Sequence, residues 1–146
     1  MQKRFTLTEA ESLIPRVERL LRDAIALKSE YQEMERGFQA FNERVMLMGG
    51  MIVDREEYLA AKQRRETVAE RLRAAIDEVQ EVGCFLKDLD IGLIDFPTVF
   101  RGVEVYLCWK LGEEGIRFWH GVEEGFRGRK AIDQDFLDHH HGDRNQ

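Results

Sequence analysis

Between residues 13 and 48, apolar side chains recur at alternating steps of four and three residues. A mean spacing of about 3.5 residues predicts a long helix with one apolar stripe, which a partner helix must cover. Residues 58–82 repeat this spacing and are the expected partner helix. The first stripe contains Leu13, Val17, Leu20, Ala24, Leu27, Tyr31, Met34, Phe38, Phe41, Val45 and Met48, and the second contains Tyr58, Ala61, Arg65, Val68, Leu72, Ala75, Val79 and Val82.

Signals at the ends of these segments predict an antiparallel hairpin. Thr8 and Glu11 have the Ser/Thr-x-x-Glu spacing of a capping box, and Pro15 predicts a kink or a short first turn. Gly49-Gly50 should end the first helix, and Asp54 should cap the second. Because the connection is short, the two helices must run antiparallel. Its methionine-rich, apolar sequence is expected to pack on the hairpin or on a second copy, or else to contact a partner protein.

After Gly83 the pattern changes to short runs separated by glycines, which is typical of a small antiparallel β-meander. If Leu111 pairs with Ile116, the last two strands present one apolar face and one polar and aromatic face, as a half-buried sheet requires. In this register Cys108 and His120 point to opposite faces, so we do not expect them to act together as nucleophile and base or as zinc ligands. The expected strands cover residues 84–87, 93–96, 103–111 and 116–120.

The sequence therefore predicts an α+β fold made of three parts. Residues 1–82 form an antiparallel helical hairpin, a coiled-coil arm. Residues 83–132 form a small β-meander module that packs on the arm, and residues 133–146, which include three consecutive histidines, form a disordered tail. Because two helices bury only one face each, we expect a homodimer in which the arms of two copies pack together.

Composition limits the classes of function. The formal net charge is −6, and the parts before and after Gly83 each carry more Asp and Glu than Lys and Arg. Nucleic acids and anionic membranes require clustered basic residues, so neither is an expected partner. The chain has no apolar run of the roughly 20 residues that span a bilayer, and its first residues lack the apolar core of a signal peptide. With only two cysteines there is no disulfide framework, and we expect a cytoplasmic protein.

The segment from Lys87 to Phe96 is the main candidate for chemistry, because it places three carboxylates close together. Such groups bind Mg²⁺ or Ca²⁺ or transfer protons, but an EF-hand that started at Asp88 would have Val99 in place of its final Glu. Alternatively, the carboxylates bond to their own turns or to nearby basic residues. The prediction includes neither a metal ion nor a cofactor. The candidate binding surface consists of Lys87, Asp88, Asp90, Asp95, Tyr106, Cys108, Trp119, His120 and Arg129.

Motifs along most of the chain carry a family resemblance. They are Leu7-Thr8-Glu9-Ala10, Lys87-Asp88-Leu89-Asp90-Ile91-Gly92-Leu93-Ile94-Asp95-Phe96-Pro97, Val105-Tyr106-Leu107-Cys108-Trp109, Phe118-Trp119-His120, and Gly125-Phe126 with Arg129. Up to about Ile132 the chain resembles a bacterial family known only as domain of unknown function 2203. The resemblance implies no assigned activity, cofactor or substrate. It does imply a site in the β module, because the shared residues there are polar and aromatic rather than only apolar.

Two hypotheses about function follow. The first is a non-enzymatic, self-associating interaction or assembly protein, because most of the chain forms two helices that each carry an apolar stripe. The second is a small enzyme or a metal- or anion-binding domain that uses Lys87, Asp88, Asp90 and Asp95 with Arg129. Convergence of these five side chains on an open pocket would favour the second hypothesis, and pairing among themselves would favour the first.

Overall fold

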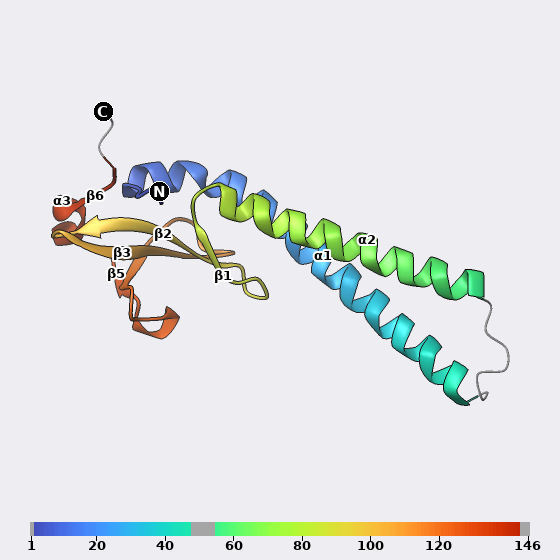
Figure 1. The fold of residues 1–146 in the computed structure, drawn as a ribbon. Coiled ribbons are helices and arrows are strands. Elements are labelled where there is room, and N and C mark those ends of the chain that lie inside the picture. The colour runs from blue at the N-terminus through green and yellow to red at the C-terminus, as the bar shows by residue number, and fades with distance from the viewer. Residues whose placement is uncertain (1, 48–54, 144–146) are drawn as a thin grey trace.

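The computed structural model describes residues 2–47 and 55–143, and it shows a long helical hairpin followed by an antiparallel sheet (Figure 1). Helices α1 (Leu7–Leu47) and α2 (Arg55–Glu81) pack on each other and extend well beyond the sheet. The predicted α+β fold is confirmed. The remaining elements are β1 (Phe85–Asp88), β2 (Leu93–Phe100), β3 (Val103–Lys110), β4 (Phe118–Gly121), the short 3₁₀ helix η1 (Phe126–Gly128), β5 (Lys130–Ala131), α3 (Gln134–His139) and β6 (His140–His141).

The apolar stripes predicted for α1 and α2 face each other. Every stripe residue in the described part of the chain is buried or half-buried. Near the far end of the hairpin, the ring of Phe38 lies 5.5 Å from that of Tyr58, centroid to centroid. The Arg65 guanidinium lies over Phe38 at 4.3 Å and also pairs with Glu35 at 3.3 Å. The spacing of apolar residues therefore identified the contact between the helices correctly. Among the described residues, neither helix is both long and apolar enough to cross a membrane.

The start of α1 differs from the prediction by two residues. The Oγ1 atom of Thr6 accepts a hydrogen bond from the backbone N–H of Glu9 at 3.1 Å, and the Glu9 carboxylate accepts one from the N–H of Thr6 at 3.2 Å. This reciprocal pair is a capping box, but it uses Thr6 rather than Thr8. The helix then continues through Pro15. The predicted cap at Asp54 and helix end at Gly49-Gly50 lie outside the described residues.

The sheet has the strand order β1-β2-β3-β4-β5, and β6 pairs with the end of β2. Strands β2 and β3 form its longest pair, over eight residues each. Arg101 and Gly102 join them with φ angles of 51° and 80°, which is the positive-φ geometry of a type I′ turn. This two-residue turn sets the β2–β3 register, in which Asp95 lies directly opposite Cys108.

The register between β3 and β4 differs from the prediction by one residue. Tyr106 pairs with His120, whereas the prediction paired Leu111 with Ile116 and placed the side chain of His120 on the other face. Because the side-chain period of a strand is two, this shift moves every β4 side chain across the sheet. Cys108 and His120 therefore share a face, and the prediction that they point apart was wrong.

Two adjacent aromatic residues explain this error. Phe118 and Trp119 are both large and apolar, so alternation alone does not show which of them faces the core. In the structure Trp119 takes the core face, where its ring lies 5.1 Å from Phe136 and 5.1 Å from Phe100. Phe118 takes the opposite face and lies beneath Arg129. The partners of Trp119 come from the C-terminal segment, which the prediction had treated as disordered.

One face of the sheet packs against the first part of α1 and the end of α2, and the core lies between them (Figure 1). Apolar residues from both layers are fully buried there. Among the largest of them are Phe5, Val17, Leu21, Val79, Ile94, Phe96, Leu107 and Trp109. The opposite face of the sheet carries Asp95 of β2, Tyr106 and Cys108 of β3 and His120 of β4.

The C-terminal segment is ordered as far as Asp143, although the prediction was a disordered tail. Asp133 caps α3 by accepting a hydrogen bond from the backbone N–H of Phe136 at 2.9 Å, and Phe136 is completely buried. The Nε2 atom of His140 accepts a hydrogen bond from the backbone N–H of Leu7 at 3.0 Å, at the start of α1. The last described residues therefore complete the core and one end of α1.

Two glycines should respond to the same substitution with opposite signs. Gly92 has a φ of +66°, and an added Cβ would lie 2.5 Å from the Cβ of Leu111, whereas an added Cβ at Gly37 in α1 would meet nothing within 4 Å. We expect Gly92→Ala to lower the free energy of unfolding by about 1–3 kcal/mol. Gly37→Ala should raise it by about 0.5–1 kcal/mol, because alanine favours the helix. Urea unfolding measures the change for each variant. If both substitutions shifted the free energy of unfolding in the same direction, the contrast between a crowded turn at Gly92 and an open helix position at Gly37 would be contradicted.

Candidate functional site

A buried polar cluster lies on the face of the sheet opposite the core. Asp95 of β2, Cys108 of β3 and His120 of β4 have exposed fractions of 1%, 0% and 3%. One carboxylate oxygen, the Sγ atom and one ring nitrogen of these residues all lie within 4.8 Å of one another. The cluster forms because Asp95 is paired with Cys108 across two strands and the β4 register brings His120 to the same side.

The hydrogen bonds of His120 define the charge of this cluster. Its Nε2 atom lies 2.9 Å from Oδ1 of Asp95, and its Nδ1 atom lies 2.8 Å from the backbone oxygen of Gly121. A backbone carbonyl only accepts, so Nδ1 carries a proton. One further proton is shared between Nε2 and the carboxyl group, and the pair is neutral as a whole. Burial raises the pKa of Asp95, while the hydrogen bond and charge of His120 act in the opposite direction.

Cys108 is not a reactive nucleophile in this arrangement. Burial raises the pKa of its thiol to about 12, and the nearby Asp95 carboxylate acts in the same direction. Arg129 opposes this effect but does not outweigh it. A nucleophilic cysteine also needs a base, and both ring nitrogens of His120 are already hydrogen-bonded to oxygen atoms. The cluster therefore lacks the arrangement of a thiolate–imidazole catalyst.

A small cavity of about 190 Å³ opens beside this cluster. Asp95 and His120 form part of its wall, together with Lys87 from β1 and Tyr106 from β3. The Lys87 ammonium lies 5.0 Å from the centre of the Tyr106 ring. Phe126 of η1 lines the cavity as well. Phe126 is not among the predicted site residues, although an aromatic residue in a glycine-rich segment was the available signal.

Arg129 anchors the segment that carries Phe126. Its Nη1 atom pairs with Glu113 at 3.0 Å, and its guanidinium lies 4.0 Å from the ring centre of Phe118 and 4.3 Å from that of Phe126. One hypothesis from the sequence placed Arg129 in the same site as the acidic residues at 88–95. The structure instead pairs Arg129 with Glu113, and the next residue, Lys130, with Glu124 at 2.6 Å. Lys130 lowers the pKa of Glu124 by hydrogen bonding to it.

The three aspartates of the predicted acidic site do not converge. Asp90 pairs with Lys28 of α1, and the Asp88 carboxylate accepts a hydrogen bond from the backbone N–H of Asp90 at 2.9 Å. Both side chains are exposed, and of the three only Asp95 reaches the cavity with Lys87. The first part of this loop therefore connects the sheet to the helical arm.

The other predicted site residues fall into two groups. Tyr106, Cys108 and His120 lie on the polar face of the sheet with Asp95. Trp119 lies on the core face, so Tyr106 and Trp119 do not share the polar and aromatic face that the predicted register implied.

The sequence matches the family described as "Uncharacterized conserved protein (DUF2203)" over residues 3–132. The chain belongs to this family. No curated protein and no solved structure matches it. The DUF2203 match confirms the resemblance found in the motifs, and it covers both the hairpin and the polar cluster. It ends before α3, although Phe136 of that helix is part of the core.

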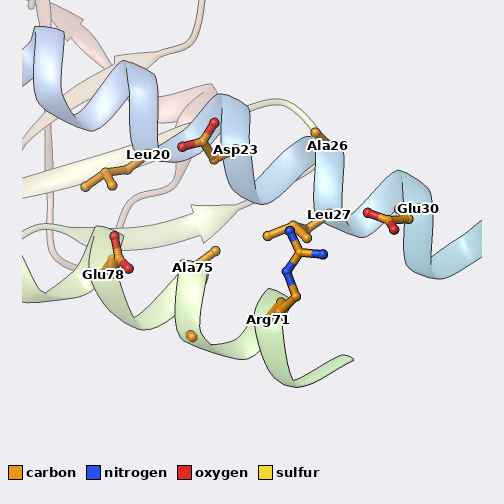
Figure 2. A pocket seen from close by; sticks show the side chains of 9 residues that line it. Leu20, Asp23, Ala26, Leu27, Glu30, Arg71, Ala75 and Glu78 are labelled. Atoms are coloured by element: carbon orange, nitrogen blue, oxygen red, sulfur yellow. The ribbon is translucent and has the colours of Figure 1, made fainter. Parts of the chain in front are cut away.

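A second hollow of this DUF2203 chain lies between the two long helices, with a volume of about 480 Å³. Figure 2 shows side chains of α1 and α2 lining it from both sides. Apolar and small residues alternate there with charged ones. The apolar residues are Leu20, Ala26, Leu27, Ala74 and Ala75, and the charged ones are Asp23, Glu30, Arg71 and Glu78. We call this surface the hairpin groove.

Proposed function

We propose that this DUF2203 protein is a cytoplasmic, non-enzymatic interaction protein that forms a homodimer through its helical hairpin. The observation that carries the proposal is the hairpin groove, a hollow between the two long helices that small, apolar and charged side chains line together. The free cysteines Cys84 and Cys108 are compatible with a reducing compartment. Because the cluster of Asp95, Cys108 and His120 lacks an activated nucleophile, the helical arm supplies the better-supported activity.

The hairpin buries little of its own length. Helix α1 has 41 residues and α2 has 27, yet beyond the sheet-covered first part of α1 the buried residues are Ala24 and Phe38, and in α2 they are Val68 and Val79. The other residues of the two stripes are only half-buried. Packing of two hairpins into a four-helix arrangement would cover these half-buried residues and bury additional apolar area.

The residues of the hairpin groove support a second copy of the chain as the partner. Ala26, Ala74 and Ala75 are small, so a helix that approaches the groove can pack closely. Charges of both signs surround them, with Arg71 on one helix and Asp23 on the other. In a two-fold symmetric dimer the same groove meets itself, so each Arg71 can approach acidic residues of the other copy.

A substitution in the hairpin groove should separate the two copies. We expect the unmodified protein to be a dimer at micromolar concentration in sedimentation velocity experiments. Ala26→Arg should weaken the dimer by about tenfold or more, because the long arginine side chain would occupy the space that the approaching helix needs. Ala40→Arg is the matched control, since Ala40 is an exposed alanine of the same helix outside the groove.

Helix content measured by circular dichroism should be the same in both variants. A monomeric unmodified protein would contradict the proposal. A dimer that responds equally to Ala26→Arg and Ala40→Arg would show that the groove is not the contact.

The hairpin end offers the second apolar surface. Met46 and Leu47 have exposed fractions of 80% and 87%, and Leu59 on α2 has 48%. These residues support the expectation that this end of the hairpin contacts a protein, either the second copy or a different partner. The connection between the helices, residues 48–54, lies outside the described residues.

A further inference from the structure

The buried polar cluster contains one ligand of each kind that zinc accepts: a carboxylate, a thiol and an imidazole. With metal–ligand distances of about 2.0–2.3 Å, a tetrahedral centre holds its ligand atoms about 3.3–3.6 Å apart. In the structure Oδ1 of Asp95 and Nε2 of His120 are 2.9 Å apart, and the ligand atoms of Asp95, Cys108 and His120 all lie within 4.8 Å. Small side-chain adjustments would therefore bring the three atoms to tetrahedral spacing.

The hydrogen bond from His120 to Gly121 adds independent support. Imidazoles that bind metals usually donate their second N–H to a backbone oxygen or a carboxylate, which fixes the tautomer and the ring. Here Nδ1 donates to the Gly121 oxygen at 2.8 Å, so Nε2 is the nitrogen directed into the cluster. The backbone positions are also fixed, because Asp95 and Cys108 are direct partners in the β2–β3 pair.

We propose that Asp95, Cys108 and His120 bind one divalent metal ion of the zinc class. Asp95 and His120 also line the cavity, so a fourth coordination position would face it. The proposal does not depend on dimerisation through the hairpin groove, since the cluster lies in the sheet.

The charges of the cluster balance when a metal binds. A divalent ion replaces the proton of the Cys108 thiol and the proton that Asp95 and His120 share. The resulting thiolate, carboxylate and neutral imidazole give a centre with no net charge. Such a centre tolerates burial, and it also tolerates the positive charges of Arg129 beside Cys108 and of Lys87 on the cavity wall.

Titration of the full chain with Zn²⁺ and Co²⁺, after treatment with a chelator, tests the site. We expect about one ion per chain and a higher melting temperature with Zn²⁺, because an ion that binds the folded state stabilises it. The Co²⁺ complex should show the near-ultraviolet charge-transfer absorption of a thiolate ligand and the visible bands of tetrahedral coordination.

The two cysteines give a matched pair of variants. Cys108→Ala should remove the charge-transfer absorption and weaken Zn²⁺ binding by about 100-fold or more, while it leaves the Asp95–His120 pair in place. Cys84→Ala should leave both measurements unchanged, because Cys84 is buried in the core, where its thiol donates a hydrogen bond to the backbone oxygen of Val79. Circular dichroism and urea unfolding would show that both variants fold.

The exposed histidines of the C-terminal segment require a separate control. His139 and His141 are exposed and can bind Zn²⁺ at the surface. Zn²⁺ binding that persists in a His139→Asn/His141→Asn variant supports the proposal. The proposal is overturned if the unmodified protein binds no ion, if Cys108→Ala binds Zn²⁺ as tightly as the unmodified protein, or if the His139→Asn/His141→Asn variant abolishes binding.

Discussion

Replacement of Asp95 or His120 by alanine is expected to lower the free energy of unfolding by about 3–5 kcal/mol. Each substitution leaves the other member of the pair buried without its partner, at an exposed fraction of 1% or 3%. A group that is removed from water and has lost its hydrogen bond incurs its full desolvation cost. Guanidinium unfolding with a chelator present measures this loss without a contribution from bound metal.

The double variant Asp95→Ala/His120→Ala tests whether the two residues act as a unit. It should lose less stability than the sum of the single variants, with a coupling of about 1–3 kcal/mol, because no unpaired partner remains. Additive losses would show that the 2.9 Å contact between Nε2 and Oδ1 contributes little to folding.

Phe136→Ala should lower the free energy of unfolding by a similar amount, about 3–5 kcal/mol. The ring of Phe136 is completely buried and stacks on Phe100 at 5.0 Å and on Trp119 at 5.1 Å, centroid to centroid. Its removal leaves a cavity between β2, β4 and α3. Leu137→Ala is the matched control, because Leu137 is 41% exposed and should lose less than about 1 kcal/mol.

Thermal or guanidinium unfolding compares the two substitutions directly. If Phe136→Ala were as mild as Leu137→Ala, the C-terminal segment would not be part of the cooperative core. That result would favour the disordered tail that the sequence alone suggested.

The helical hairpin could be predicted because its information is local and repetitive. An apolar residue at every third or fourth position determines which face of each helix is covered, and all described stripe residues follow this rule. The start of α1 was predicted two residues too late, because Thr6 with Glu9 and Thr8 with Glu11 both have capping-box spacing. The structure uses the first pair, where His140 also accepts a hydrogen bond from Leu7. This long-range contact has no local signal.

The candidate site could be predicted only in part. Asp95, Cys108 and His120 belong to the predicted binding surface, and the four predicted strands overlap β1 to β4, but the convergence of the three side chains depends on a single-residue register. That register follows from the packing of Trp119 on Phe136, a contact between distant parts of the chain. The alternation of apolar and polar residues predicted the wrong β3–β4 register, because Phe118 and Trp119 are adjacent and both apolar. The tail was misjudged for a similar reason, since one buried aromatic among polar residues leaves no periodic pattern.

The pairing of the two ends of the chain affects how the protein can fold during its synthesis. The backbone N–H of Asp143 donates a hydrogen bond to the backbone oxygen of Arg4, and the backbone N–H of Arg4 donates one to the Asp143 carboxylate. His140 meets the first turn of α1. A ribosome makes residues 4–7 long before residues 136–143. The growing chain can therefore form its hairpin early, but it must leave part of the core exposed to water until α3 and β6 have been synthesised.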